Sequence, residues 1–178
     1  METIELVDTA IKIGLGAFIS GFSTYLVTTK NNKHQMVSSL IEKKVTILQS
    51  ASENMDTYLI KLSDVLSWMD GVLRYGTTPG VITKKELDTF QIRKKDGQLI
   101  ESRELSTKAI SQLKLIGAFD AAKACEDIYD VENRFRIMVI FSHTIPTTSE
   151  LADFKKEFNS IREKIDKEKQ LYFEKLYV

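Results

Sequence analysis

Cysteine, proline and histidine are scarce in this chain of 178 residues. It has one cysteine, two prolines and two histidines, and 25 basic residues balance 25 acidic ones. A single cysteine, Cys125, excludes an internal disulfide framework, and its place among alanines is typical of a small buried residue. The balanced charge argues against a nucleic-acid partner, because such proteins usually carry a basic stripe and a high pI.

Motifs of catalytic and metal chemistry are missing as well. The sequence has no H-E-x-x-H, no Cys-x-x-Cys and no G-x-S-x-G. Neither His34 nor His143 follows a glutamate by three residues, as a di-iron helical bundle requires. Four acidic residues between 126 and 132 are interpreted as a solvated helix face rather than a cation site. We therefore expect no enzyme, no cofactor, and no catalytic or metal-binding residue.

Glycines and apolar residues dominate the opening segment, IKIGLGAFISGFSTYLV at 11–27. A dinucleotide-binding fingerprint would need a third glycine at position 19, but Ile19 stands there and Gly21 comes two residues late. A secretory signal would begin with basic residues, whereas this chain begins METIELVD. Both a phosphate loop and a signal peptide are therefore disfavoured.

A membrane-spanning helix explains this segment better. Between Lys12 and Lys30 lie seventeen uncharged residues, which as a helix span roughly 25 Å, near the lower limit for a bilayer core. Small residues recur four apart, as membrane-helix packing favours, and these candidates are Gly16, Ala17, Ser20 and Gly21. The alternative is that the same helix is buried in the core of a soluble bundle.

The charges on either side of this segment predict its orientation. Glu2, Glu5 and Asp8 precede it, whereas mainly lysines follow it. Because basic residues favour the cytoplasmic side, we expect a single-pass protein of the bacterial inner membrane with its N-terminus outside. The predicted domains are a membrane anchor over 1–32, in contact with lipid, and a cytoplasmic helical body over 33–178.

The body is predicted to be all-α. A heptad pattern over 33–74 indicates a long helix, and a capping box at Thr83 begins a short helix that is expected to close at 96–97. Two more long helices are expected, over 102–142 and from Thr147, where a second capping box stands. Together they predict an antiparallel three-helix, coiled-coil-like bundle with a short capping helix, whose last helix runs away from the anchor.

These features favour a membrane-anchored interaction or scaffold protein without catalytic activity. Its bundle would meet an unknown protein partner or a second copy of the chain, and the candidate contact residues are Trp68, Tyr172 and Tyr177. Two alternatives stay open. One is a membrane-acting phage-exclusion or defence effector, or its antagonist, that oligomerises through the small-residue stem. The other is a soluble helical regulatory bundle that buries its first helix.

Overall fold

A computed structural model describes the backbone of residues 2–75 and 78–177. Side chains are described from residue 23 onward, except those of 26, 32–34, 76–77 and 178. The chain divides into two compact units, residues 1–43 and residues 44–178. The first helix, α1 (Glu2–Arg74), supplies residues to both units.

Residues 2–43 of the first unit are helical throughout. The predicted packing residues Gly16, Ala17, Ser20 and Gly21 lie outside the residues whose side chains the structure describes. Within the part of the chain whose side chains the structure describes, no helix is long and apolar enough to cross a membrane.

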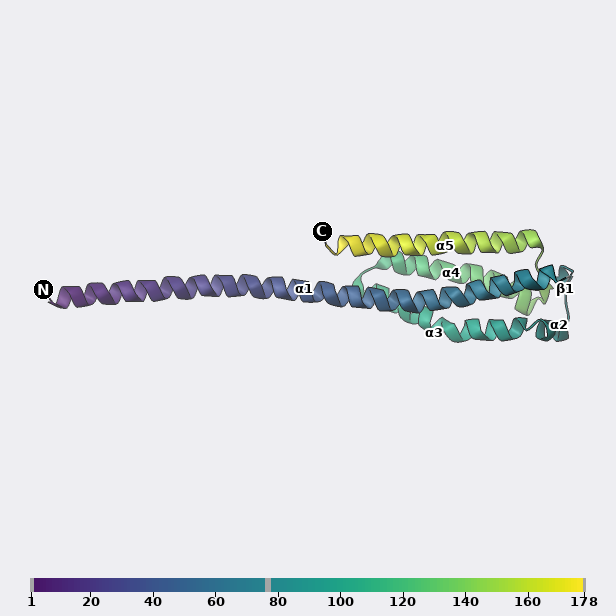
Figure 1. The fold of residues 1–178 in the computed structure, drawn as a ribbon, viewed down its shortest axis with the longest axis horizontal. Coiled ribbons are helices and arrows are strands. Elements are labelled where there is room, and N and C mark those ends of the chain that lie inside the picture. Colours follow the sequence, from purple (N-terminus) through teal and green to yellow (C-terminus); the bar gives the residue numbers. More distant parts are fainter. Residues whose placement is uncertain (1, 76–77, 178) are drawn as a thin grey trace. The chain divides into compact units, whose positions relative to one another are not determined.

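The second unit is a bundle of four long helices, of which α1 is the first, with one short helix between the first and the second (Figure 1). After α1 come β1 (Gly80–Val81), α2 (Lys84–Thr89), α3 (Ile92–Ile116) and α4 (Phe119–Arg136). A π-helical turn, η1 (Ile137–Phe141), leads to β2 (Thr144–Ile145), which pairs antiparallel with β1, and α5 (Thr148–Lys175) ends the chain. The chain is mostly helical, as the sequence predicts, and both predicted capping boxes, at Thr83 and Thr147, are confirmed.

The prediction of three helices is wrong, because the helix expected over 102–142 divides at Gly117. This glycine has φ +87°, and its backbone N–H donates to the carbonyl of Lys114 at 3.1 Å. The next residue, Ala118, donates to the carbonyl of Leu113 at 2.9 Å. A glycine in the left-handed region ends a helix in this way at little steric cost. The chain therefore reverses here, and α3 and α4 form two antiparallel helices.

The short capping helix also differs from its prediction. It ends at Thr89, and Gln91, at φ +55°, separates α2 from α3. Asp96 and Gly97, the predicted end, lie within α3 instead. Asp96 is buried and accepts from Arg136 of α4, with its Oδ1 2.6 Å from the arginine Nε. A carboxylate expected to stop a helix therefore joins two helices.

The direction of α5 is the third difference from the prediction. Lys155 pairs with Asp70 and Lys169 pairs with Asp56, so residue numbers rise along α5 while they fall along α1. The last helix is therefore antiparallel to the first, and Phe173 near its end lines the same groove as Val45 of α1. The C-terminal aromatics lie at the end of the bundle where α1 enters it.

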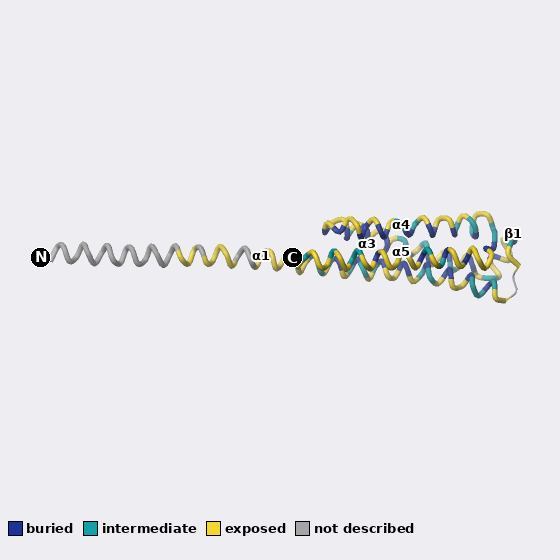
Figure 2. Tube along the Cα trace, turned by 90° about the horizontal axis from the view of Figure 1, so that it is seen from above, coloured by how far each residue is buried: buried dark blue, intermediate teal, exposed yellow. Residues whose placement is uncertain are grey.

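The core of the bundle is the predicted apolar stripe of α1 packed against α3, α4 and α5. Figure 2 shows buried and exposed positions alternating along the bundle helices, as helices that are buried on one side require. Of the predicted stripe residues of α1, Ile41 and Leu73 are half-buried. The others are buried: Leu48, Ala51, Met55, Tyr58, Leu59, Leu62, Val65, Leu66, Met69 and Val72.

Besides Asp96, one more charged side chain is buried in the described part of the bundle. Glu132 of α4 is fully buried, accepts a hydrogen bond of 2.5 Å from the Tyr58 hydroxyl, and pairs with Arg103 of α3 at 2.8 Å. Burial, reinforced by the nearby carboxylate, raises the pKa of Tyr58 far above its usual range. The prediction of a solvated face is therefore wrong for Glu132, whereas Glu126 and Asp127 do form ion pairs at the surface.

Candidate functional site

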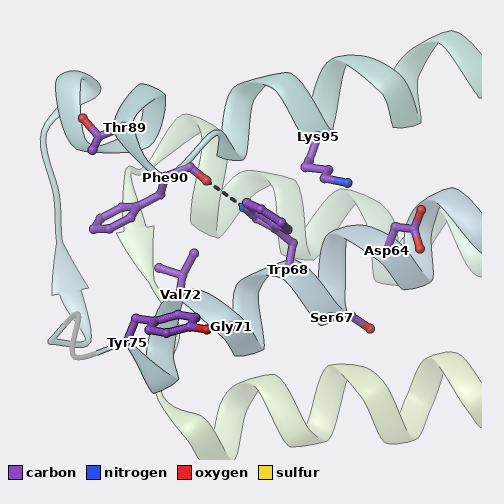
Figure 3. Close-up of a pocket in the computed structure, with 9 residues that line it drawn as sticks. All are labelled: Asp64, Ser67, Trp68, Gly71, Val72, Tyr75, Thr89, Phe90 and Lys95. Carbon is purple, nitrogen blue, oxygen red and sulfur yellow. Dashed lines mark hydrogen bonds between the residues drawn. The ribbon is translucent and has the colours of Figure 1, made fainter.

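An open pocket of about 530 Å³ lies where the last turns of α1 face the junction of α2 and α3 (Figure 3). Its volume falls in the range of ligand-binding pockets, roughly 300–1,000 Å³. The lining is mostly apolar, and its residues are Asp64, Ser67, Trp68, Gly71, Val72, Tyr75, Thr89, Phe90 and Lys95.

Trp68, a predicted contact residue and the only tryptophan of the chain, is fixed in the wall of this pocket. Its indole Nε1 donates to the carbonyl of Phe90 at 2.6 Å, and 40% of the residue is exposed. Phe90 is the C-cap of α2, next to the left-handed Gln91. The break between α2 and α3 therefore presents the carbonyl that orients the indole ring.

Lys95 closes one side of the pocket with a positive charge. Its Nζ lies 5.0 Å from the centre of the Trp68 ring, within the range of a cation–π interaction. Figure 3 shows Lys95, Asp64 and Ser67 toward one end of the pocket, and Phe90, Val72 and Tyr75 toward the other. The pocket is therefore amphipathic, with a polar end and an apolar end.

Gly71 keeps space open beside Trp68. A Cβ atom added at Gly71 would meet nothing within 4 Å, and the residue lines the pocket. Glycine within a helix costs about 1 kcal/mol relative to alanine, so this position gives up helix stability and leaves space at the pocket. Gly97 of α3 is equally free of neighbours but does not line the pocket, and it therefore serves as a matched control.

The remaining predicted contact residues lie at the other end of the bundle. The Tyr172 hydroxyl donates to the carbonyl of Ile116 and so attaches α5 to the end of α3. Tyr177 is 64% exposed, and its ring centre lies 5.2 Å from that of Phe173. The structure therefore does not bring Trp68 together with the two tyrosines, and a contact role for the tyrosines stays a prediction.

Most of the pocket was not predicted, although α1 carries a signal for it. Trp68, Gly71, Val72 and Tyr75 are spaced i, i+3, i+4 and i+7, which places them on one helix face. A tryptophan next to a glycine on such a face indicates an aromatic wall with an open neighbour. The contribution of Lys95 has no such signal, because it depends on the break at Gln91.

The lone cysteine does not form a second site. Cys125 is fully buried, and burial raises the pKa of its thiol to about 12. A thiol of that pKa is almost entirely protonated near neutral pH, and the thiolate is the reactive form. The prediction of a small, buried structural residue is confirmed.

No protein-family model matches the chain, and no curated protein and no solved structure matches it either. A function must therefore be inferred from the residues and their geometry.

Proposed function

We propose that this chain is a non-catalytic, membrane-tethered interaction protein that docks a protein partner at the Trp68 pocket. The open amphipathic pocket is the observation that carries the proposal. Every buried side-chain nitrogen and oxygen atom in the described part of the chain has a hydrogen-bond partner. The buried polar groups therefore have no unmet hydrogen bond to offer a ligand, whereas the pocket of about 530 Å³ offers open space beside a half-exposed tryptophan.

The residue types at the pocket suit a protein interface. Tryptophan and tyrosine are enriched among the residues that dominate binding energy, and Tyr75, which lines the same pocket directly after the end of α1, is 93% exposed. The orientation of Trp68 is fixed in advance by its hydrogen bond to Phe90, so a partner would lose little entropy in ordering the indole.

The membrane tether is the second part of the proposal. The uncharged run between Lys12 and Lys30 and the two pairs of small residues within it, each pair four positions apart, support a span over part of 1–32. The lysines that follow support a cytoplasmic position for the bundle of a bacterial inner-membrane protein. Docking through Trp68 would then tether a partner to the membrane.

Membrane fractionation tests the tether. The full chain is expressed, membranes are washed at pH 11 to strip peripheral proteins, and pellet and supernatant are compared. We expect the wild type to remain in the pellet and a variant with Ile19→Arg and Phe22→Arg to leave it, because arginine within a span is costly. Release of the wild type by the wash would refute the tether.

Site-specific cross-linking tests the docking role. A photoreactive phenylalanine analogue replaces Tyr75 at the pocket or, as a control, the exposed Leu115 near the other end of the bundle. We expect a discrete cross-linked protein from the Tyr75 position only. Gly71→Leu should abolish that product, and the matched Gly97→Leu should not. A product that survives Gly71→Leu would show that the pocket is not the docking site.

A further inference from the structure

We propose that the Trp68 pocket takes an acidic peptide segment of its partner, which inserts one large apolar side chain and places a carboxylate near Lys95. This inference rests on the docking role proposed above and adds the chemistry of the partner. The shape of the pocket, the charge of the α2–α3 segment beside it and the position of Lys95 each support it.

The apolar end and the polar end of the pocket suit two different kinds of side chain of the partner. Val72 is buried, Phe90 is half-buried and Tyr75 is exposed, so the apolar end continues from the core to the surface. A large aliphatic or aromatic side chain that enters there removes apolar surface from water on both partners. The backbone of the partner would then pass over Gly71, where no side chain stands in its way.

The segment around the α2–α3 junction, which supplies Thr89, Phe90 and Lys95 to the pocket, is positive. Residues 84–95 hold five cations against two exposed carboxylates, Glu86 and Asp88. Glu86 caps the start of α2, and Asp88 lies 3.8 Å from Arg93. Among the residues that the structure describes, no carboxylate lies within ion-pair distance of the four lysines in this group: Lys84, Lys85, Lys94 and Lys95.

Lys95 is the one cation of this segment that lines the pocket. The residue is half-buried, and its ammonium group lies over the indole ring of Trp68. Asp64 lines the same end, so the two charges of the lining balance, and the excess positive charge comes from the three other lysines of the α2–α3 segment that have no ion pair among the described residues. Charge complementarity steers partners and suppresses those of the wrong sign, so an acidic segment is favoured over a basic one.

Peptide binding to the full-length chain in phosphatidylcholine nanodiscs tests the inference. The probe is a fluorescein-labelled octapeptide with Leu-Phe at its centre and three glutamates on each side. Two control peptides carry lysines in place of the glutamates, or Ala-Ala in place of Leu-Phe. We expect fluorescence anisotropy to give a Kd below about 100 μM for the probe and at least tenfold weaker binding for both controls. Raising the ionic strength should weaken the probe's binding, because exposed charges are screened.

Variants of the chain then locate the binding site. The double change Lys94→Glu and Lys95→Glu should weaken binding at least fivefold, whereas Lys123→Glu, at an exposed lysine of α4, should not. Gly71→Leu should abolish binding, and Gly97→Leu should leave it unchanged. With 5-fluorotryptophan incorporated, the chain has a single ¹⁹F resonance, that of residue 68, and the probe should shift it.

The outcomes separate this inference from the docking role. Equal binding of the lysine peptide would overturn the inference, while a cross-link from Tyr75 that is lost on Gly71→Leu would still support docking. Probe binding that resists Gly71→Leu would place the peptide elsewhere and overturn the inference too. Free 4-phenylbutyrate that shifts the resonance at lower concentrations than the peptide would point to a small amphipathic acid instead, and would also overturn it.

Discussion

Replacing the buried Glu132 by leucine should destabilise the bundle strongly. The carboxylate accepts from Tyr58 of α1 at 2.5 Å and from Arg103 of α3, with ion-pair and hydrogen-bond distances of 2.8 and 2.9 Å. Leucine is similar in volume, so the expected loss comes from the two donors left without a partner rather than from a cavity. Glu126→Leu on the same helix is the control, because its ion pair with Lys114 is exposed.

The magnitude follows from the exposure of the partners. Breaking a buried ion pair by removing one member costs about 3–5 kcal/mol. Arg103 keeps 35% of its side chain exposed, so water can solvate part of the guanidinium and the cost should be near the lower limit, about 3 kcal/mol. Tyr58→Phe removes one hydrogen bond to a charged group and should cost about 1.5–2 kcal/mol. The surface control should change the free energy of unfolding by less than about 1 kcal/mol.

Urea unfolding of the full chain in an uncharged detergent, followed by the fluorescence of Trp68, measures these differences. Loss of about 3 kcal/mol corresponds to a melting temperature roughly 6–12 °C lower. A triple variant with Tyr58→Phe, Arg103→Met and Glu132→Leu should be more stable than Glu132→Leu alone, since no buried polar group then lacks a partner. If the single variant were no less stable than Glu126→Leu, or the triple variant were the least stable, the reasoning would be refuted.

Three other predictions concern the chain reversal, the thiol and a helix cap. Gly117→Ala should cost about 1–2 kcal/mol in urea unfolding, because alanine is strained at φ +87° although its Cβ would meet no neighbour. Cys125 should react with iodoacetamide at pH 8 only at the rate at which the bundle opens, and fast labelling of folded protein would contradict its burial. The pKa of Glu150 is lowered by hydrogen bonds from Thr147, so the stabilisation that Glu150 provides is present above its ordinary pKa of 4.5 and is lost as pH falls below it. Acid unfolding of Glu150→Gln, followed by circular dichroism, should therefore lack this component.

Features that depend on near neighbours in sequence could be predicted. Each capping box needs only a threonine and a glutamate three residues apart, and both form as expected. The stripe of α1 repeats every seven residues, and from Leu48 to Val72 its predicted core positions are buried.

Features that depend on distant residues could not be predicted. Asp96 resembles a helix stop until Arg136, forty positions later in the chain, buries and neutralises it. Glu132 continues a run of surface acids, and only Tyr58 and Arg103 explain why it points inward. At Gly117 the apolar pattern continues on both sides, so periodicity alone does not distinguish a packing residue from a chain reversal.

The candidate site was predicted in part for the same reason. Trp68 is recognisable in the sequence, and its spacing to Gly71 and Tyr75 is a local signal on one helix. The Phe90 carbonyl and Lys95 both contact Trp68. They come close to it only because Gln91, a non-glycine residue, adopts a left-handed conformation between α2 and α3. Such a conformation is uncommon outside glycine, so helix propensity alone does not indicate it.

Trp68 and Gly71 belong to the same helix that begins at Glu2. Within the bundle, the part of α1 that carries both residues packs against α3, α4 and α5. A pulling force applied at Trp68 would therefore be resisted by these three helices, which oppose local unwinding of α1 at the pocket.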